Sequence, residues 1–359
     1  MQRHRNMAFL KIENVSIKGL SACVPSTVEE NRDLPFYSTH EEADQVIAAT
    51  GIERRHICPD GMTTSDLCLK AAEKLIEELE WEKDSLDLIA YCTQDPDYLN
   101  HPTSFVIHDK LGLPNSCMCI DFYHGCPGWV NSLSSVSSMI SASGLKRAIL
   151  LVGDMCSHDA GKANREERPL FGDSGTATAL EYDENAKPIL FNVITKSADG
   201  MALARKNGGW RAPFTLETLK ADIDRREGLV PASETTDKMD GMDVFSFAIT
   251  TVPKTLKQMC ANFDISLDNI DKLVLHQANE MILKTIAKRM KIEMERVPLS
   301  LKEYGNTTGA SVPLTIVSQC ADYQNMELRS LCCGFGTGLA CACVYFETSK
   351  IICPSIIEL

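Results

Sequence analysis

Three side chains of this sequence could do chemistry together: the thiol of Cys126, the imidazole of His276 and the amide of Asn306. A cysteine can carry an acyl group as a covalent intermediate. A neutral imidazole and a side-chain amide both donate hydrogen bonds, so the pair could hold a carbonyl oxygen while it gains enolate charge. Such a set suits carbanion chemistry on thioesters. A lone histidine or asparagine is usually structural, and the prediction therefore depends on the three residues together.

Cys126 lies between an apolar run and a predicted helix. Pro127 suits the first position of that helix, where its missing N–H is no loss. Apolar residues then recur at steps of three and four until Gly144, which suits the stop. The positive end of the helix would lie beside the sulfur, which predicts a lowered thiol pKa and a reactive thiolate. The alternative is a buried cysteine without a role, and the local pattern leaves the two interpretations about even.

Hydrophobic periodicity along the chain predicts helices that alternate with strands, as in βαβ units. The predicted helices are at 66–82, 244–263 and 280–290, and the predicted strands at 84–93, 147–154 and 175–183, with a strand and loop at 271–279. This alternation is typical of an α/β protein.

Two pairs of segments also resemble each other, in the same order along the chain. Residues 83–94 match 267–278, and the segment around Cys126 matches 297–321, which holds Asn306. We therefore predict two duplicated βαβαβ-type halves, 1–185 with the cysteine and 186–359 with the histidine and asparagine. Loops at the strand ends of both halves would then meet at one site. The polar, glycine-dotted stretch at about 198–243 is predicted to be an insertion with a lid or loop role.

Composition limits the classes of function. The chain has 359 residues, 44% of them hydrophobic, and a formal net charge of −13, which argues against a nucleic-acid partner. It has no run of 18 apolar residues, so we expect no membrane span and a cytoplasmic enzyme with reduced thiols. Among its 15 cysteines, the pairs 117/119 and 341/343 have the spacing of buried strand residues. No metal site and no redox cofactor are predicted.

Six motifs carry a resemblance to a known family: TGIERRHI (50–57), DLIAYCTQDPDY (87–98), IDFYHGCPGW (120–129), LFGDSGTATALE (170–181), HQAN (276–279) and YGNTTGAS (304–311). With them the chain resembles the β-ketoacyl-acyl-carrier-protein synthase III family of the thiolase superfamily, over nearly its whole length. HQAN together with GNT is specific, because the elongating synthases have a second histidine and thiolases add a second catalytic cysteine. The resemblance implies a thiolase-like fold, layered α-β-α-β-α, and a homodimer.

The resemblance also implies an acyltransferase that works as a Cys–His–Asn condensing enzyme without a cofactor. Cys126 would take an acyl group from an acyl thioester. His276 and Asn306 would hold the thioester carbonyl of malonyl-acyl-carrier protein (malonyl-ACP) while it loses carbon dioxide, and the enolate would attack the acyl-cysteine to give a β-ketoacyl-ACP. Backbone N–H groups of Cys126 and of a turn near Cys333 would form the oxyanion hole. The pathway would be fatty-acid initiation or a specialised lipid or polyketide route.

The same resemblance assigns residues that bind the substrate or CoA. Arg165 matches an arginine on the adenine side of CoA, and Asn279 belongs to the HQAN motif. Gln45 and Glu53 replace the other two clamp residues, so the choice between CoA and ACP as acyl donor stays open. His101 lies on a loop that, in the family, reaches across the dimer into the partner's acyl pocket. Some members have an aromatic residue there, and we expect an acyl preference unlike a plain acetyl starter.

Carrier proteins are acidic, so this acidic chain needs a local basic patch to dock one. Five residues near the expected entrance are candidates: Arg205, Lys206, Arg211, Lys254 and Lys257. An ordinary solvated surface explains these cations equally well.

Two other functions stay open at this point. One is an acyltransferase that passes the acyl group from Cys126 to a hydroxyl or amine without condensation. HQAN and GNT disfavour it, because simple transfer needs a base for its acceptor more than an enolate cradle. The other is a thiolase-fold subunit that only binds a partner. The intact trio argues against it, because packing does not require those three residues together.

Overall fold

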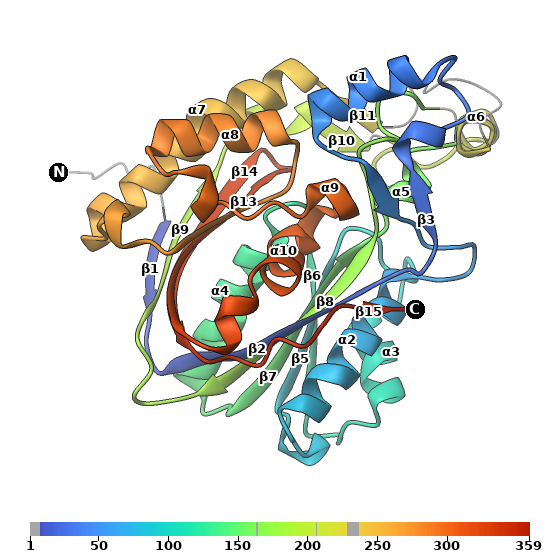
Figure 1. Cartoon of the computed structure of the whole chain (residues 1–359). Coiled ribbons are helices and arrows are strands. Elements are labelled where there is room, and N and C mark those ends of the chain that lie inside the picture. Colours follow the sequence, from blue (N-terminus) through green and yellow to red (C-terminus); the bar gives the residue numbers. More distant parts are fainter. Residues whose placement is uncertain (1–7, 163, 206, 228–236) are drawn as a thin grey trace.

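Two central β-sheets organise the molecule in the computed structural model, which describes residues 8–162, 164–205, 207–227 and 237–359 (Figure 1). The six-stranded sheet has the order β15-β2-β8-β7-β5-β6, and the five-stranded sheet has the order β1-β9-β14-β13-β12. The strands of the first sheet are β2 (Val15–Val24), β5 (Leu88–Thr93), β6 (Met118–Tyr123), β7 (Arg147–Asp154), β8 (Ser174–Tyr182) and β15 (Ile357–Glu358). Those of the second are β1 (Ala8–Ile12), β9 (Ile189–Thr195), β12 (Lys272–Leu275), β13 (Glu327–Gly336) and β14 (Ala340–Ser349).

The two sheets repeat one pattern of strand pairing. In the first, β5 runs parallel to β7, β7 antiparallel to β8, and β8 antiparallel to β2. In the second, β12 runs parallel to β13, β13 antiparallel to β14, and β14 antiparallel to β9. The predicted α/β fold with a duplicated topology is confirmed. The division of the chain near residue 185 stays a prediction, because each sheet also takes a strand, β1 or β15, from the other segment.

Helices cover both sheets and fill the space between them (Figure 1). The outer face of the six-stranded sheet carries α2 (Thr64–Glu78) and α3 (Thr103–Leu111), and that of the five-stranded sheet carries α7 (Gly241–Phe263) and α8 (Glu280–Met290). Between the sheets lie α4 (Gly128–Ser143) and α10 (Ser311–Gln319). This is the predicted α-β-α-β-α layering. The shorter or peripheral helices are α1 (His40–Thr50), α5 (Cys156–Asp159) and α9 (Leu301–Tyr304).

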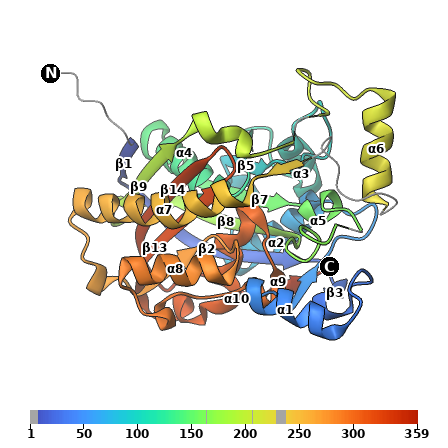
Figure 2. The same cartoon turned by 90° about the horizontal axis from the view of Figure 1, so that it is seen from above.

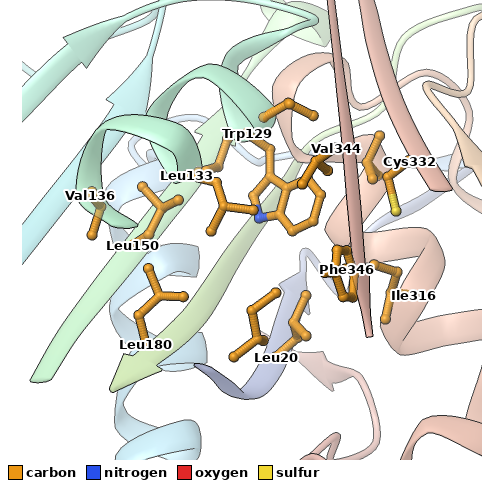
Figure 3. Close-up of a cluster of buried hydrophobic side chains, with 14 of the residues drawn as sticks. Leu20, Trp129, Leu133, Val136, Leu150, Leu180, Ile316, Cys332, Val344 and Phe346 are labelled. Atoms are coloured by element: carbon orange, nitrogen blue, oxygen red, sulfur yellow. The ribbon is translucent and has the colours of Figure 1, made fainter. Parts of the chain in front are cut away.

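The central core explains why α4 is buried. Figure 3 shows Trp129 and Leu133 of α4 between side chains of the two sheets, among them Leu150 of β7 and Phe346 of β14. The indole nitrogen of Trp129 donates a hydrogen bond to the hydroxyl of Thr178 at 3.0 Å, so the ring is buried without an unsatisfied donor. Burial of this helix fixes its N-terminus between the sheets, at the place where Cys126 lies.

The segment predicted as an insertion contains elements of its own. A short hairpin pairs β10 (Leu203–Arg205) with β11 (Asp237–Met239), and α6 (Leu216–Arg226) projects from the body of the molecule (Figure 2). A second two-stranded sheet pairs β3 (Val28–Glu30) with β4 (Arg54–His56). Among the described residues, no helix combines the length and apolar character that crossing a bilayer requires.

Candidate active site

Cys126 lies in the turn between β6 and α4, as the sequence predicts. The N-cap of α4 is Pro127, so the cysteine immediately precedes the helix, and the N–H of Gly128 closes the turn on the carbonyl of Gly125 at 2.7 Å. The side chain is 8% exposed. Most of the surface of this residue is therefore shielded from water.

The far side of the sulfur is closed by the end of β13. A β-carbon placed on Gly336 would lie 2.7 Å from the Cys126 sulfur, and the hydroxyl of Thr337 lies 3.9 Å from it. The prediction of a turn near Cys333 is wrong. Cys333 lies inside β13, which pairs with β12 on one side and with β14 on the other. The loop that faces the thiol begins after Gly336, at Thr337.

The expectation of a lowered thiol pKa is also wrong in sign. Burial raises the pKa of Cys126 above its ordinary value, and the hydrogen bonds from the backbone and hydroxyl of Thr337 only partly offset this effect. Removing the sulfur from water therefore outweighs the neighbouring donors. Cys126 is a thiol at neutral pH and must lose its proton when it attacks.

His276 follows β12 directly and is 2% exposed. Its backbone N–H donates to the carbonyl of Cys333 at 2.8 Å, and its ring packs edge-to-face on Phe335, with centroids 5.2 Å apart. Nδ1 lies 2.7 Å from the hydroxyl of Ser311, at the start of α10. Burial lowers the pKa of the imidazole to about 4, and a hydrogen bond to the Thr308 backbone only partly opposes this. His276 is thus neutral at pH 7, as the predicted role requires.

Asn306 is held in an extended segment beside Phe171. Its N–H donates to the carbonyl of Leu170 at 2.8 Å, and its carbonyl accepts from the N–H of Gly172 at 3.2 Å. The side-chain Oδ1 accepts from the N–H of Thr308 at 2.9 Å. Since the oxygen is occupied, the NH₂ group is the part of this amide that can donate to a substrate.

The three residues belong to one connected cluster. Phe335 contacts His276, and the two glycines beside it, Gly334 and Gly336, approach Cys126. Thr308 bonds to both His276 and Asn306. The structure thus brings the three predicted residues into one cluster: Cys126 and His276 follow β6 and β12, and Asn306 follows α9.

Sequence reasoning missed a buried carboxylate beside this cluster. Asp154, the last residue of β7, is 1% exposed and accepts hydrogen bonds from both halves of the molecule. Asp95 lies close to it, and burial together with the charge of Asp154 raises the pKa of Asp95. The sequence feature that could have indicated this residue is an aspartate at the end of the apolar strand RAILLVGD, because a charge is unusual there.

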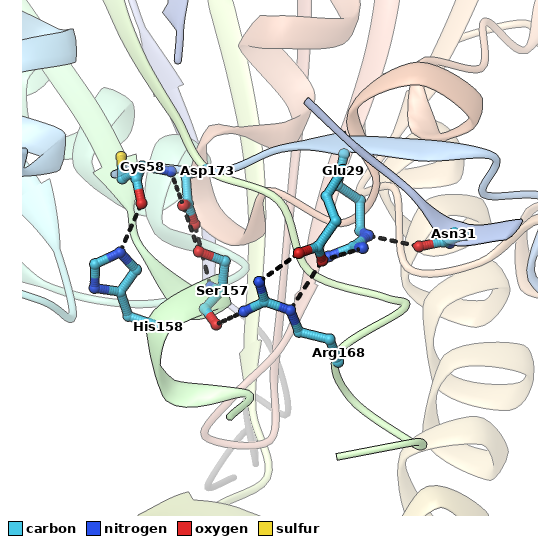
Figure 4. A network of polar contacts seen from close by, with 8 residues as sticks. Glu29, Asn31, Cys58, Ser157, His158, Arg168 and Asp173 are labelled. Atoms are coloured by element: carbon cyan, nitrogen blue, oxygen red, sulfur yellow. Dashed lines mark hydrogen bonds and ion pairs between the residues drawn. The ribbon is translucent and has the colours of Figure 1, made fainter. Parts of the chain in front are cut away.

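A polar network supports the segment that pairs with Asn306 (Figure 4). The buried guanidinium of Arg55 contacts Glu29 at 2.6 Å, and Arg168 contacts the same carboxylate at 2.7 Å. Asp173 accepts from the N–H of Cys58 at 2.8 Å and from the hydroxyl of Ser157 at 2.5 Å. Residues of the motifs TGIERRHI and LFGDSG therefore hold in place the segment that pairs with Asn306.

The predicted binding residues have varied surroundings. Arg165 contacts Glu42 at 3.1 Å and lies over the rings of Phe36 and Tyr37. Asn279 is the N-cap of α8, with its side-chain oxygen accepting from the N–H of Ile282 at 2.9 Å. His101 is exposed and has a φ of 140°. Their roles in binding substrate stay predictions.

The candidate docking cations fall into two groups. Lys254 and Lys257 of α7 line a surface groove together with Arg289 of α8. Arg205 instead pairs with Asp159 at 2.9 Å and Asp222 at 3.4 Å. Arg211 is exposed, and Lys206 lies outside the described residues.

The side chains of three buried cysteines cluster within the five-stranded sheet. The sulfurs of Cys333, Cys341 and Cys343 lie within 4.8 Å of one another, on neighbouring positions of β13 and β14. They face the apolar core under α7 and α8. The predicted burial of the 341/343 pair is confirmed.

The chain matches known proteins over most of its length. Residues 120–198 match the family model "3-Oxoacyl-[acyl-carrier-protein (ACP)] synthase III", and residues 260–348 match the model of its C-terminal part. A β-ketoacyl-[acyl-carrier-protein] synthase III of Fusobacterium nucleatum is 31% identical, over 85% of this chain and 89% of that protein. One of Streptococcus pneumoniae is 29% identical, over 93% and 97%. The crystal structure of a 3-oxoacyl-(acyl-carrier protein) synthase from Burkholderia xenovorans superimposes with a TM-score of 0.90 at 30% identity and covers 99% of both chains.

The duplicated sheets, the helices buried between them and the cysteine at the start of one such helix define a thiolase-fold condensing enzyme. Within that class, the chain belongs to the β-ketoacyl-acyl-carrier-protein synthase III family.

Proposed function

We propose that this chain is an acyltransferase that condenses a Cys126-bound acyl group with malonyl-ACP, with loss of carbon dioxide, to give a β-ketoacyl-ACP. One observation carries the proposal: the end of β13 contacts both Cys126 and His276, while Thr308 links His276 to Asn306. A nucleophile and two hydrogen-bond donors therefore share one buried site, and two-step thioester chemistry needs this set.

In the first step the thiol of Cys126 attacks the carbonyl carbon of an acyl thioester. The S–H proton passes to the departing thiolate of the acyl donor. A new carbon–sulfur bond forms and the old one breaks. Because burial raises the pKa of Cys126, this proton transfer accompanies the attack and is not complete beforehand.

In the second step malonyl-ACP loses carbon dioxide. The electrons of the broken carbon–carbon bond move into an enolate, whose oxygen accepts from Nε2–H of His276 and from the Asn306 amide. The enolate carbon then attacks the acyl carbonyl on Cys126 and expels the cysteine sulfur, which takes up a proton. We propose that the Ser311 hydroxyl, 2.7 Å from Nδ1, donates to that nitrogen, which leaves the proton of neutral His276 on Nε2 for this step.

For the oxyanion hole we propose the N–H of Cys126 and a donor from the Gly336–Thr337 loop, in place of Cys333. Hydrogen bonding from the Thr337 backbone to the Cys126 sulfur supports this choice. The tetrahedral oxyanion forms beside that sulfur, where a loop N–H is available and a strand N–H is engaged in pairing.

We also propose that the enzyme is a homodimer that pairs through β6. β6 is an edge strand, and Met118 and Tyr123 on it are 46% and 77% exposed. Leu99, next to His101 in the neighbouring loop, is 100% exposed. An edge strand with exposed apolar side chains favours pairing with a second copy, which would carry His101 towards the partner's site. Light scattering should show a dimer, and exchange of both Met118 and Tyr123 to glutamate should give monomers; a monomeric wild type would exclude the dimer.

The acyl donor, the pathway and the cytoplasmic location stay predictions, as does a reaction without metal or redox cofactor. Arg165, Asn279 and His101 are the residues whose exchange should change donor preference. A panel of acyl-CoAs and acyl-ACPs, compared in wild type and in Arg165→Ala, would separate the two donor classes.

Acylation of the thiol is the decisive test. We would incubate the protein with that panel, locate the acyl mass by peptide mass spectrometry, and then add malonyl-ACP. The proposal expects the acyl group on the Cys126 peptide, its discharge by malonyl-ACP and release of carbon dioxide. Cys126→Ala should lose all three, while Cys260→Ala, which removes a comparably buried thiol in α7, should keep them. Acylation that malonyl-ACP cannot discharge would instead indicate simple acyl transfer, and no acylation would indicate a binding subunit.

A further inference from the structure

Asp154 has no part in the steps above, yet it is buried at the centre of the site. Its Oδ1 accepts from the N–H of Gln94 at 2.8 Å and from the hydroxyl of Thr93 at 3.1 Å, both at the end of β5. Its Oδ2 accepts from the hydroxyl of Thr308 and from the N–H of Gly309 at 3.1 Å. One carboxylate therefore joins the half that carries Cys126 to the loop that carries Asn306.

The link from Asp154 to Asn306 passes through Thr308. Thr308 has a φ of 47°, in the left-handed region that a β-branched residue rarely adopts. Its hydroxyl bonds to Asp154, and its N–H bonds to Oδ1 of Asn306. The carboxylate thus holds Thr308 in a conformation that in turn fixes the orientation of the asparagine amide.

We propose that Asp154 is the positioning residue that sets the Asn306 amide for holding the enolate oxygen. This inference rests on the proposed function. Only an acceptor with two oxygens can satisfy four donors from two segments. Asparagine at this position would turn an NH₂ group towards two of those donors, and leaving buried donors unsatisfied is destabilising. The loop would then shift relative to Cys126.

Burial raises the pKa of the Asp154 carboxyl to about 7, and the hydrogen bonds from Gln94, Thr308 and Gly309 offset this effect only in part. The positioning role therefore rests on the four hydrogen bonds of the carboxyl group.

The test compares Asp154→Asn with Asp87→Asn. Asp87 also accepts backbone N–H groups, from Lys146 at 2.6 Å and Arg147 at 3.1 Å, but it lies at the opposite end of the same two strands. A second pair, Thr308→Val and Thr308→Ser, removes or keeps the hydroxyl that contacts Asp154. For each protein we would measure Cys126 acylation, malonyl-ACP decarboxylation, the thermal midpoint and amide hydrogen exchange of residues 304–311.

Asp154→Asn should speed hydrogen exchange in 304–311 by about tenfold without a matching change elsewhere. It should slow decarboxylation by about 100-fold while Cys126 acylation stays within about threefold of wild type. Thr308→Val should also slow decarboxylation more than acylation, but by a smaller factor. Thr308→Ser, which keeps the hydroxyl, should restore the rate of decarboxylation. Combining Asp154→Asn with Asn306→Ala should be no worse than Asn306→Ala alone, because both changes remove one interaction.

Other outcomes would overturn the inference. Equal losses in both half-reactions, or losses that multiply in the double variant, would mean that Asp154 only stabilises the fold. Unchanged exchange in 304–311 would mean that it does not hold the loop. If wild type itself failed to decarboxylate malonyl-ACP, the proposed function would fail, and the exchange measurement would still decide whether Asp154 positions Asn306.

Discussion

Gly336 lies against the thiol of Cys126 so closely that a β-carbon on the glycine would be 2.7 Å from the sulfur. Its φ of 148° is also outside the range that other residues adopt readily. The two residues are 210 positions apart, Gly336 at the end of β13 and Cys126 in the turn before α4, so their contact joins the two halves of the molecule around the proposed nucleophile.

Gly336→Ala should therefore disable the thiol. We expect the rate of Cys126 acylation to fall by about 100-fold, because the sulfur must move from its position. Gly144→Ala is the matched control: its φ of 84° gives similar backbone strain, but nothing lies within 4 Å of the added carbon. The control should lower the thermal midpoint and leave acylation unchanged. Comparable acylation in both variants would contradict the assigned contact.

The raised pKa of Cys126 predicts slow alkylation at neutral pH. The rate of iodoacetamide labelling, followed on the Cys126 peptide, should inflect above the ordinary thiol value of 9. Thr337→Ala should move the inflection higher still, since the Thr337 hydroxyl lowers this pKa, and Thr337→Ser should restore it. An inflection below pH 8 in wild type would show that the helix N-terminus dominates after all.

Neutral His276 predicts a pH dependence of stability. The folded pKa is about 4 against 6.5 ordinarily, so between these values the unfolded chain binds a proton that the folded chain does not. Stability from this group is therefore full above pH 6.5 and falls by about 1.4 kcal/mol per unit as the pH drops towards 4. Urea unfolding of wild type and His276→Gln at pH 7, 5.5 and 4.5 measures the free energy of unfolding of each protein. The difference between the two proteins should change with pH by this slope. A difference that is the same at all three pH values would rule out the lowered pKa.

The α7–α8 groove predicts a docking effect. Exchange of Lys254, Lys257 and Arg289 to glutamate should raise KM for malonyl-ACP about tenfold or more, because an acidic partner would then meet like charge. Decarboxylation of a small malonyl thioester should not change. Lys74→Glu on α2, over the other sheet, should leave both substrates unaffected. If KM for malonyl-ACP stays constant in the triple variant, the carrier binds elsewhere.

The sequence by itself determined the candidate catalytic residues and the architecture that carries them. The strand-end cysteine before Pro127, HQAN and GNT are local motifs, and hydrophobic periodicity needs only neighbouring residues. For this reason the alternation of helices and strands, the duplicated halves and the layering agree with the structure, although observed bounds such as Leu88–Thr93 for β5 shift by a few residues.

Only the tertiary structure decided what surrounds those residues. The contact of Gly336 with Cys126 and the bonds of Asp154 to Thr308 join segments more than 150 positions apart, and no local pattern encodes such pairs. The sign of the Cys126 pKa shift was missed for the same reason. The helix end beside the sulfur is visible in the sequence, but the loss of water around it depends on how both sheets close over the site.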